Sequence, residues 1–337
     1  MKQITDNREE IMKVKITGKS HAKPNKKLGR RECRLVTFDL PYIALHYNQK
    51  LLVYKGNEYE DMVGKLKDGL GAVLEDFYQL AGKLARDEDW VFSVEYDDDD
   101  TEGVEVVEAD AEWIAVEDVD AEVAASTLKE LLPYNGILNS EGLHRPLLSV
   151  QLTKLKDGLA MGLAFNHAVL DGTSTWHFMS SWAQICSGLP SVSVLPFLDR
   201  TKVRNTRVKL QHPTPDQDPQ NAPSNGTADA EHVDPPLIRE RVFKFSESAI
   251  DKIKSKVNSD PPSDGSKPFS TFQSLAVHMW RHVTRARQLK PEDYTVLVVF
   301  ADCRKRVDPP NAGKLLWQPD SGHFHGDLCR VVDDEPT

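Results

Sequence analysis

The chain has 337 residues, of which 39% are hydrophobic and 28% are charged, and its formal net charge is −10. This balance is typical of a globular protein, and the length indicates two domains. The acidic charge argues against a nucleic acid as the main partner, because a basic face is needed to neutralise phosphates. No apolar run is long enough to cross a bilayer, so we expect no membrane span.

The cysteine pattern and the N-terminal segment bear on location. The four cysteines are widely separated, without the spacing of metal ligands, at Cys33, Cys186, Cys303 and Cys329. They indicate a reducing compartment and no structural metal. Residues 1–11 are polar and mixed in charge, unlike a secretory signal, so we expect a cytoplasmic protein. Translation could start at Met1 or at Met12.

Apolar periodicity predicts strands and one long helix in the first half. Residues 33–54 alternate apolar and polar around Pro41, which favours two strands joined by a turn. Residues 59–84 carry apolar residues at helical spacing, which predicts a helix with one buried face. The four aspartates at 97–100 predict a solvated loop. Further strands are expected over residues 103–107, 147–152 and 159–166.

A histidine follows the last of these strands in the segment FNHAVLDG, residues 165–172. An imidazole has a pKa of about 6.5, so His167 can take a proton from a hydroxyl or amine that attacks a carbonyl. A helix is predicted over 173–187, with Thr173 as its N-cap. The pattern HxxxD alone is weak, since a hydrogen-bonded core histidine would fit it too. Its position between a buried strand and a capped helix favours a catalytic base.

The second half begins with a polar stretch. Residues 209–236 are rich in Pro, Asn, Asp and Gln, which indicates a flexible crossover at a domain boundary. Beyond it, residues 242–257 predict a strand and then a helix, 271–287 a helix, and 295–304 a buried strand. Core packing is expected for the tryptophans at helical spacing, Trp176, Trp182 and Trp280. No metal-ligand spacing is offered by His144, His177, His278 and His282.

The sequence resembles the BAHD acyltransferases, a plant enzyme family, from about residue 14 to residue 310. The resemblance is carried by six segments, which are LVTFDLPY at 35–42, NHAVLDG at 166–172, WHFMSSWAQICSG at 176–188, PFLDR at 196–200, STFQSLAVHMWR at 270–281 and ADCRKR at 301–306. It implies an α/β fold of two chloramphenicol-acetyltransferase-like domains, with mixed sheets and flanking helices. The second of these domains is expected to be truncated.

The resemblance also implies roles for individual residues. His167 would be the general base, with Asn166 and Gly172 completing its motif. Asp171 would face away from the substrate and pair with Arg304. Three further basic residues are weaker candidates, Arg306 as an alternative partner of Asp171, and Lys254 and Lys256 as contacts of the CoA phosphates unless they form an ordinary solvated helix face. Acyl-CoA is the implied co-substrate, and no permanently bound cofactor is expected.

The resemblance stops after Pro310. One permitted nucleotide string for residues 311–328, read in a neighbouring frame, encodes TPESYFGNLIQAIFTGT, a segment of the kind that this family has here. We therefore expect a frameshift to have replaced the family's tail. The predicted organisation is an N-terminal extension at 1–11, a first acyltransferase domain at 12–200, a crossover at 201–236, a partial second domain at 237–310 and an aberrant tail at 311–337.

The expected function is direct transfer of an acyl group from a CoA thioester to an alcohol acceptor, by a monomer. Several segments resemble the subgroup of the family associated with cuticle formation, which implies a hydroxylated lipid as acceptor. Hydroxycinnamoyl transfer to a small alcohol or polyamine is an alternative. Another is an inactive or regulatory relative that keeps the fold and catalyses nothing.

Overall fold

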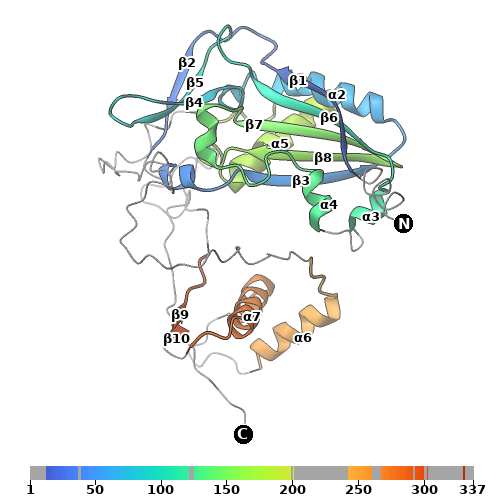
Figure 1. Ribbon diagram of the computed structural model, residues 1–337, viewed down its shortest axis with the longest axis vertical. Helices are drawn as coiled ribbons and strands as arrows, with labels where there is room; N and C mark the ends of the chain where they lie inside the picture. Colours follow the sequence, from blue (N-terminus) through green and yellow to red (C-terminus); the bar gives the residue numbers. More distant parts are fainter. Residues whose placement is uncertain are drawn as a thin grey trace, which may run out of the picture. The chain divides into compact units, whose positions relative to one another are not determined.

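A five-stranded mixed sheet is the centre of the first part of the chain, as the computed structural model in Figure 1 shows. The structure describes residues 13–36, 39–120, 125–198, 200, 242–259, 267–290, 293–299, 302 and 329–330. The chain forms two compact units. The first comprises Met1–Glu240 with Asp302–Ser321, and the second comprises Arg241–Ala301 with Gly322–Thr337.

The central sheet has the strand order β1-β6-β7-β8-β3. Its strands are β1 (Lys15–Ala22), β6 (Val104–Ala111), β7 (Leu148–Leu155), β8 (Gly158–Phe165) and β3 (Asn48–Lys55). β6 and β7 run parallel, and the other neighbours are antiparallel. The predicted strands at 103–107, 147–152 and 159–166 are thus confirmed. β8 lies between β7 and β3, so the residues that follow it leave the interior of the sheet.

β8 is buried along its whole length because both faces of the sheet are covered. Alternation along a strand sends successive side chains to opposite faces. Leu159, Met161 and Leu163 join the main core, while Ala160 joins a smaller cluster that contains Ile114. The main core includes residues of the helices α2 (Tyr59–Val73) and α5 (Gly172–Cys186). The smaller cluster is flanked by α3 (Val116–Asp120). The next helix in the chain is α4 (Ala125–Glu130), which lies close to α3 in Figure 1.

The helices α2 and α5 pack against each other over the main core. Trp182 of α5 is 2% exposed, and its indole nitrogen donates to the carbonyl oxygen of Leu66 at 3.0 Å. This confirms the predicted core position of Trp182. Trp176 is 53% exposed, so its predicted burial is wrong. The buried stripe of α5 runs instead through other residues, which are Ser174, Thr175, Phe178, Met179, Ser181 and Trp182.

The predicted helix over 59–84 is wrong beyond Val73. After α2 the chain forms the 3-10 turn η2 (Tyr78–Ala81) and then β4 (Lys83–Arg86). Phe77 and Leu80 still reach the core from this irregular segment, and both are completely buried. Their helical spacing therefore reflects burial and not a continuous helix.

A second sheet of the first unit has the order β2-β5-β4, with β2 at Arg31–Arg34 and β5 at Phe92–Tyr96. Between β2 and β3, residues Leu40–Ala44 form the 3-10 turn η1, which has Pro41 in its first turn and is not a strand. Of the two strands predicted over 33–54, the first is confirmed only at its start, in β2, and the second only at its end, in β3. Proline fixes φ near the helical value and so favours the first turn of such a segment.

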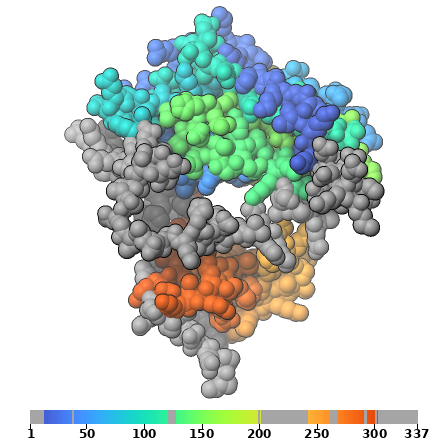
Figure 2. Space-filling model, in the orientation of Figure 1, coloured from blue at the N-terminus to red at the C-terminus, as the bar shows by residue number. Residues whose placement is uncertain are grey.

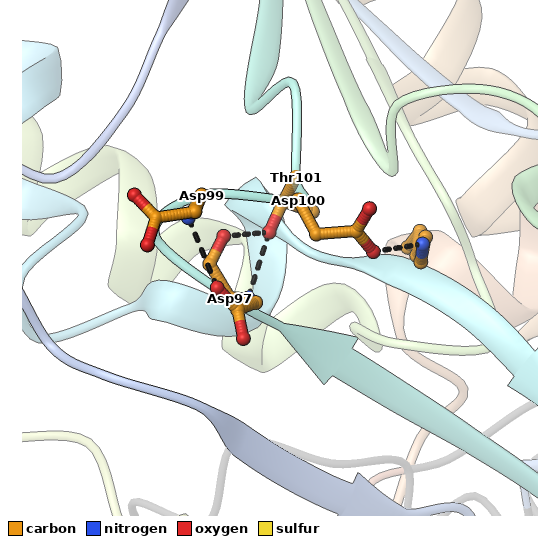
Figure 3. Close-up of polar contacts among 5 residues, drawn as sticks. Asp97, Asp99, Asp100 and Thr101 are labelled. Carbon is orange, nitrogen blue, oxygen red and sulfur yellow. Dashed lines mark hydrogen bonds and ion pairs between the residues drawn. The ribbon is translucent and has the colours of Figure 1, made fainter.

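The run of aspartates after β5 is a hydrogen-bonded turn, shown in Figure 3. The amide of Asp97 donates to the Thr101 hydroxyl at 2.7 Å, and the amide of Asp99 donates to the Asp97 carboxylate at 3.0 Å. Lys83 forms an ion pair of 2.7 Å with Asp100. The run is solvated at Asp99 and Asp100, as predicted, but its conformation is fixed by its own side chains.

The second unit contains α6 (Glu247–Val257), α7 (Thr271–Ala286) and the two-residue strands β9 (Tyr294–Thr295) and β10 (Cys329–Arg330). The predicted helix over 271–287 is confirmed, and Ser270 with Gln273 forms its capping box. Trp280 is half-buried, and its indole donates to the Thr295 hydroxyl at 3.1 Å.

Two strand predictions for this unit are wrong. Residues 242–245 form no strand, and Phe243 is 68% exposed. Among the described residues of the segment predicted as a buried strand over 295–304, only Thr295 is paired, and Val296 is 51% exposed. A strand is stabilised by its neighbours, and within the described residues β9 pairs only with the two residues of β10. Apart from β10, the tail predicted at 311–337 lies outside the described residues, as does the crossover.

Figure 2 shows blue N-terminal, cyan and green segments of the first unit packed side by side on one face. Among the helices that the structure describes, none has the length and apolarity needed to cross a membrane.

One glycine tests the close packing of the central sheet. A Cβ on Gly162 of β8 would overlap the backbone carbonyl oxygen of Leu131. Gly162→Ala should therefore lower the free energy of unfolding by about 1–3 kcal/mol, measured by urea denaturation. Gly64→Ala in α2 is the control, because nothing lies within 4 Å of its added Cβ. The control variant should be as stable as wild type or more stable by up to about 1 kcal/mol. Equal stability of the two variants would contradict the packing.

Candidate active site

His167 lies in a short loop between β8 and α5. The amide of Val169 donates to the carbonyl oxygen of Asn166 at 3.0 Å, so the loop is a single tight turn. The apolar run of β8 ends at Phe165, and α5 starts at Gly172. His167 is therefore held between two well-packed elements, at the edge of a buried loop.

Two buried asparagines fix the backbone of this loop. Asn139, which is 0% exposed, begins η3 (Asn139–Leu143), and its Oδ1 accepts from the amide of His167 at 2.8 Å. Its Nδ2 donates to the carbonyl oxygens of Tyr42 at 2.8 Å and His46 at 3.2 Å. Asn166 Nδ2 in turn donates to the backbone oxygen of Asn139 at 2.8 Å. Both asparagines thus hold the backbone of the loop; the sequence offered Asn166 as a motif residue, whereas Asn139 was not predicted.

The ring of Tyr42 is stacked on the imidazole of His167. The ring centroids are 4.6 Å apart and the planes are inclined by 29°. Tyr42 is buried and comes from η1, whose segment LVTFDLPY was recognised only as part of a resemblance. The stacked ring limits the orientations of the imidazole and shields one of its faces from water.

The surroundings of His167 favour its neutral form. Burial lowers the pKa of the imidazole below its usual 6.5, and hydrogen bonding to the backbone and the charge of Asp171 oppose this only in part. The charge of Lys50 on β3 lowers the pKa of His167 further. Lys50 is itself partly buried, which lowers its own pKa, and its Nζ donates to Asn48 Oδ1 at 2.7 Å. A neutral imidazole at pH 7 is ready to accept a proton.

Asp171 is the N-cap of α5. Its carboxylate accepts from the amide of Ser174 at 2.7 Å, and the residue is 1% exposed. The predicted cap, Thr173, is wrong, because the Thr173 hydroxyl donates to Asp302 at 3.1 Å instead. An acidic cap also interacts favourably with the positive end of the helix dipole.

The other predicted site residues are either exposed or outside the described part of the chain. Arg304 and Arg306 lie outside the described residues, so the ion pair with Asp171 stays a prediction. Gly172 is exposed, and nothing lies within 4 Å of an added Cβ, so crowding does not require glycine there. Lys254 and Lys256 are exposed in the last turn of α6.

The cap and the predicted ion pair can be separated by two substitutions of Asp171. Asp171→Asn keeps a good capping oxygen but removes the charge, whereas Asp171→Ala removes both. Asp171→Ala should lower the free energy of unfolding by at least about 0.5–2 kcal/mol, as for the loss of other N-caps. Thermal unfolding at low salt should place Asp171→Asn between wild type and Asp171→Ala. If both variants lose the same stability, charge and not capping is the main role of Asp171.

Comparison with known proteins identifies relatives over most of the chain. The profile of the Transferase family matches residues 12–315. The chain is 60% identical over 312 residues to BAHD acyltransferase DCR of Arabidopsis thaliana, which covers 89% of this chain and 64% of that protein. It is 36% identical over 254 residues to an Avena sativa hydroxycinnamoyl-CoA:5-hydroxyanthranilate N-hydroxycinnamoyltransferase, covering 73% and 55%. The chain therefore spans less than two thirds of the length of these relatives.

Solved structures share the fold at low sequence identity. Vinorine synthase superimposes with a TM-score of 0.65 and 20% identity, over 90% of this chain and 68% of that structure. Fusarium graminearum TRI101 in complex with ethyl coenzyme A gives a TM-score of 0.58 and 17% identity, over 82% and 65%. The α/β fold with mixed sheets that the resemblance implied is thereby confirmed.

Proposed function

Because the chain belongs to the transferase family, as a BAHD acyltransferase, we propose that it carries the general base for acyl transfer from a CoA thioester. The observation that supports this most is His167 itself. Its backbone is fixed by Asn139, its ring is stacked on Tyr42, and burial favours its neutral form. A base held in this way needs no reorganisation before it accepts a proton.

The proposed reaction is a direct displacement. The hydroxyl oxygen of the acceptor attacks the thioester carbonyl carbon while His167 takes the hydroxyl proton. The tetrahedral intermediate collapses, the carbon–sulfur bond breaks, and the imidazolium returns the proton to the CoA thiolate. The products are an ester and free CoA. Lys254 and Lys256 are proposed contacts of the CoA phosphates.

The acceptor that we favour is a hydroxylated lipid of the cuticle. Support comes from the 60% identity to BAHD acyltransferase DCR together with the sequence resemblance to the cuticle-associated subgroup. A second candidate is hydroxycinnamoyl transfer to a small alcohol or amine. The Avena sativa relative supports it, since its name describes that class of reaction, at 36% identity.

An acyl-transfer assay tests the proposal on two proteins. One is the 337-residue chain, and the other carries the neighbouring reading frame after Pro310. Each is incubated with long-chain acyl-CoA or hydroxycinnamoyl-CoA and with a hydroxy fatty acid, a monoacylglycerol, a small alcohol or a polyamine. CoA release is followed with a thiol reagent and products are identified by mass spectrometry.

We expect ester formation with the lipid acceptors in the frame-restored protein and loss of that activity in its His167→Ala variant. Transfer of hydroxycinnamoyl groups alone would favour the second candidate. Absence of turnover in both proteins with every pair would support an inactive relative and overturn the proposal.

A further inference from the structure

A buried ion pair lies next to the loop that carries His167. Arg200 Nη1 and Asp39 Oδ2 are 2.6 Å apart, and the two residues are 3% and 0% exposed. The second terminal nitrogen of Arg200 donates to the carbonyl oxygen of Val169 at 2.7 Å. A guanidinium is a planar fork that can make these two bonds at once, whereas a lysine ammonium lacks that geometry.

The bond to Val169 acts on the middle of the catalytic loop. Val169 is two residues after His167 and two residues before Asp171. Its amide closes the turn by donating to Asn166, and Arg200 supplies a donor to its carbonyl oxygen. A buried carbonyl needs such a donor. The turn is therefore held from both its amide and its carbonyl side.

The bond to Asp39 acts on the other side of the imidazole. Asp39 Oδ2 also accepts from the amide of Val36 at 2.7 Å, and its backbone oxygen accepts from the amide of Tyr42 at 3.1 Å. Asp39 thus fixes the start of η1, which carries the ring stacked on His167. One guanidinium ties together the loop under the imidazole and the turn that presents Tyr42.

We propose that Arg200 and Asp39 are positioning residues for His167. The pair clamps the catalytic loop to η1 and so sets the orientation of the imidazole without touching substrate. The expected effect on kcat rests on the proposed base role of His167. The expected effect on the chemical reactivity of the imidazole does not depend on that role.

The test measures that reactivity in the 337-residue chain without any substrate. Diethyl pyrocarbonate acylates neutral imidazoles, and mass spectrometry of the peptide that contains His167 gives the rate for this residue alone. Arg200→Lys keeps the charge but loses the fork, so the imidazole should be freed from Tyr42 and modified severalfold faster. In the catalytically active protein, kcat should fall by about tenfold with little change in KM for acyl-CoA, because a small misplacement of a catalytic group is costly.

Ile114→Ala is the matched control, because Ile114 is 2% exposed in the smaller core cluster on the opposite face of the sheet. It should lower Tm without changing the modification rate of His167. If Arg200→Lys does not fold, Asp39→Asn replaces it, since the amide keeps the shape and the acceptor for Val36. An unchanged modification rate in the folded variant, with a loss of Tm like that of Ile114→Ala, would show that the pair is only structural.

The two proposals fail in different ways. If His167→Ala keeps full turnover, the base role is wrong, and faster modification in Arg200→Lys still supports the clamp. If the modification rate does not change, the clamp is wrong, whatever the kinetics of His167→Ala.

Discussion

Replacing His167 with alanine should lower kcat by about 10²- to 10⁴-fold, since general-base assistance contributes that much to a rate. Binding of acyl-CoA should be almost unchanged, because the imidazole acts on the acceptor's proton. The loss should therefore appear in kcat and not in the Kd for acyl-CoA, measured by calorimetry.

His177→Gln is the control for this substitution. His177 is also a half-buried histidine, ten residues further along the chain, and its Nε2 lies 2.9 Å from the carbonyl oxygen of Val194. Glutamine can still hydrogen bond to that oxygen, so this variant should keep most of its turnover. Retained turnover in His167→Ala would exclude the base role.

Replacing Arg200 with methionine should lower the free energy of unfolding by about 3–5 kcal/mol. The substitution leaves the carboxylate of Asp39 buried without its cation, and it also removes the donor to Val169. The transition would be followed by urea denaturation at pH 7, where wild type and variant can be compared at constant m-value.

Two further variants separate the ion pair from general effects on packing. Arg200→Met combined with Asp39→Leu should recover part of the loss, because apolar replacement of both partners removes the uncompensated charge. Lys83→Met breaks the exposed pair with Asp100, and its stability should stay close to that of wild type. If Arg200→Met behaves like Lys83→Met, the buried pair is not a stabilising feature.

The part of the site that could be predicted from the sequence is the part whose signals lie close together in the chain. The apolar run of β8, the motif around His167 and the helical spacing of α5 lie within thirty consecutive residues, so their arrangement follows from periodicity. Helix α2 shows the limit of that signal. Phe77 and Leu80 continue the spacing of the helix after the chain has left it, because burial and not hydrogen bonding sets the pattern.

The residues that support His167 could not be predicted from spacing. Asn139 bonds to a residue 28 positions away, and Arg200 bonds to Asp39 across 161 positions. Single polar residues have no period, and their partners are chosen by the tertiary fold. For Asp39 and Arg200 the available signal was their presence in segments of the family resemblance, LVTFDLPY and PFLDR, to which no role was given, and Asn139 lies in none of those segments.

The most direct test of the central claim compares two pKa values of the same protein. The pKa of His167 is measured by NMR titration of the labelled imidazole, assigned with His167→Ala. The acid limb, which is the fall of kcat/KM at low pH, is measured in whichever of the two proteins, the 337-residue chain or the frame-restored protein, catalyses acyl transfer. Because the neutral imidazole is the base and burial lowers its pKa, activity should fall as pH drops through a midpoint below 6.5 that equals the NMR value. An acid limb that differs from the NMR value, or that persists in the residual activity of His167→Ala, would contradict His167 as the base.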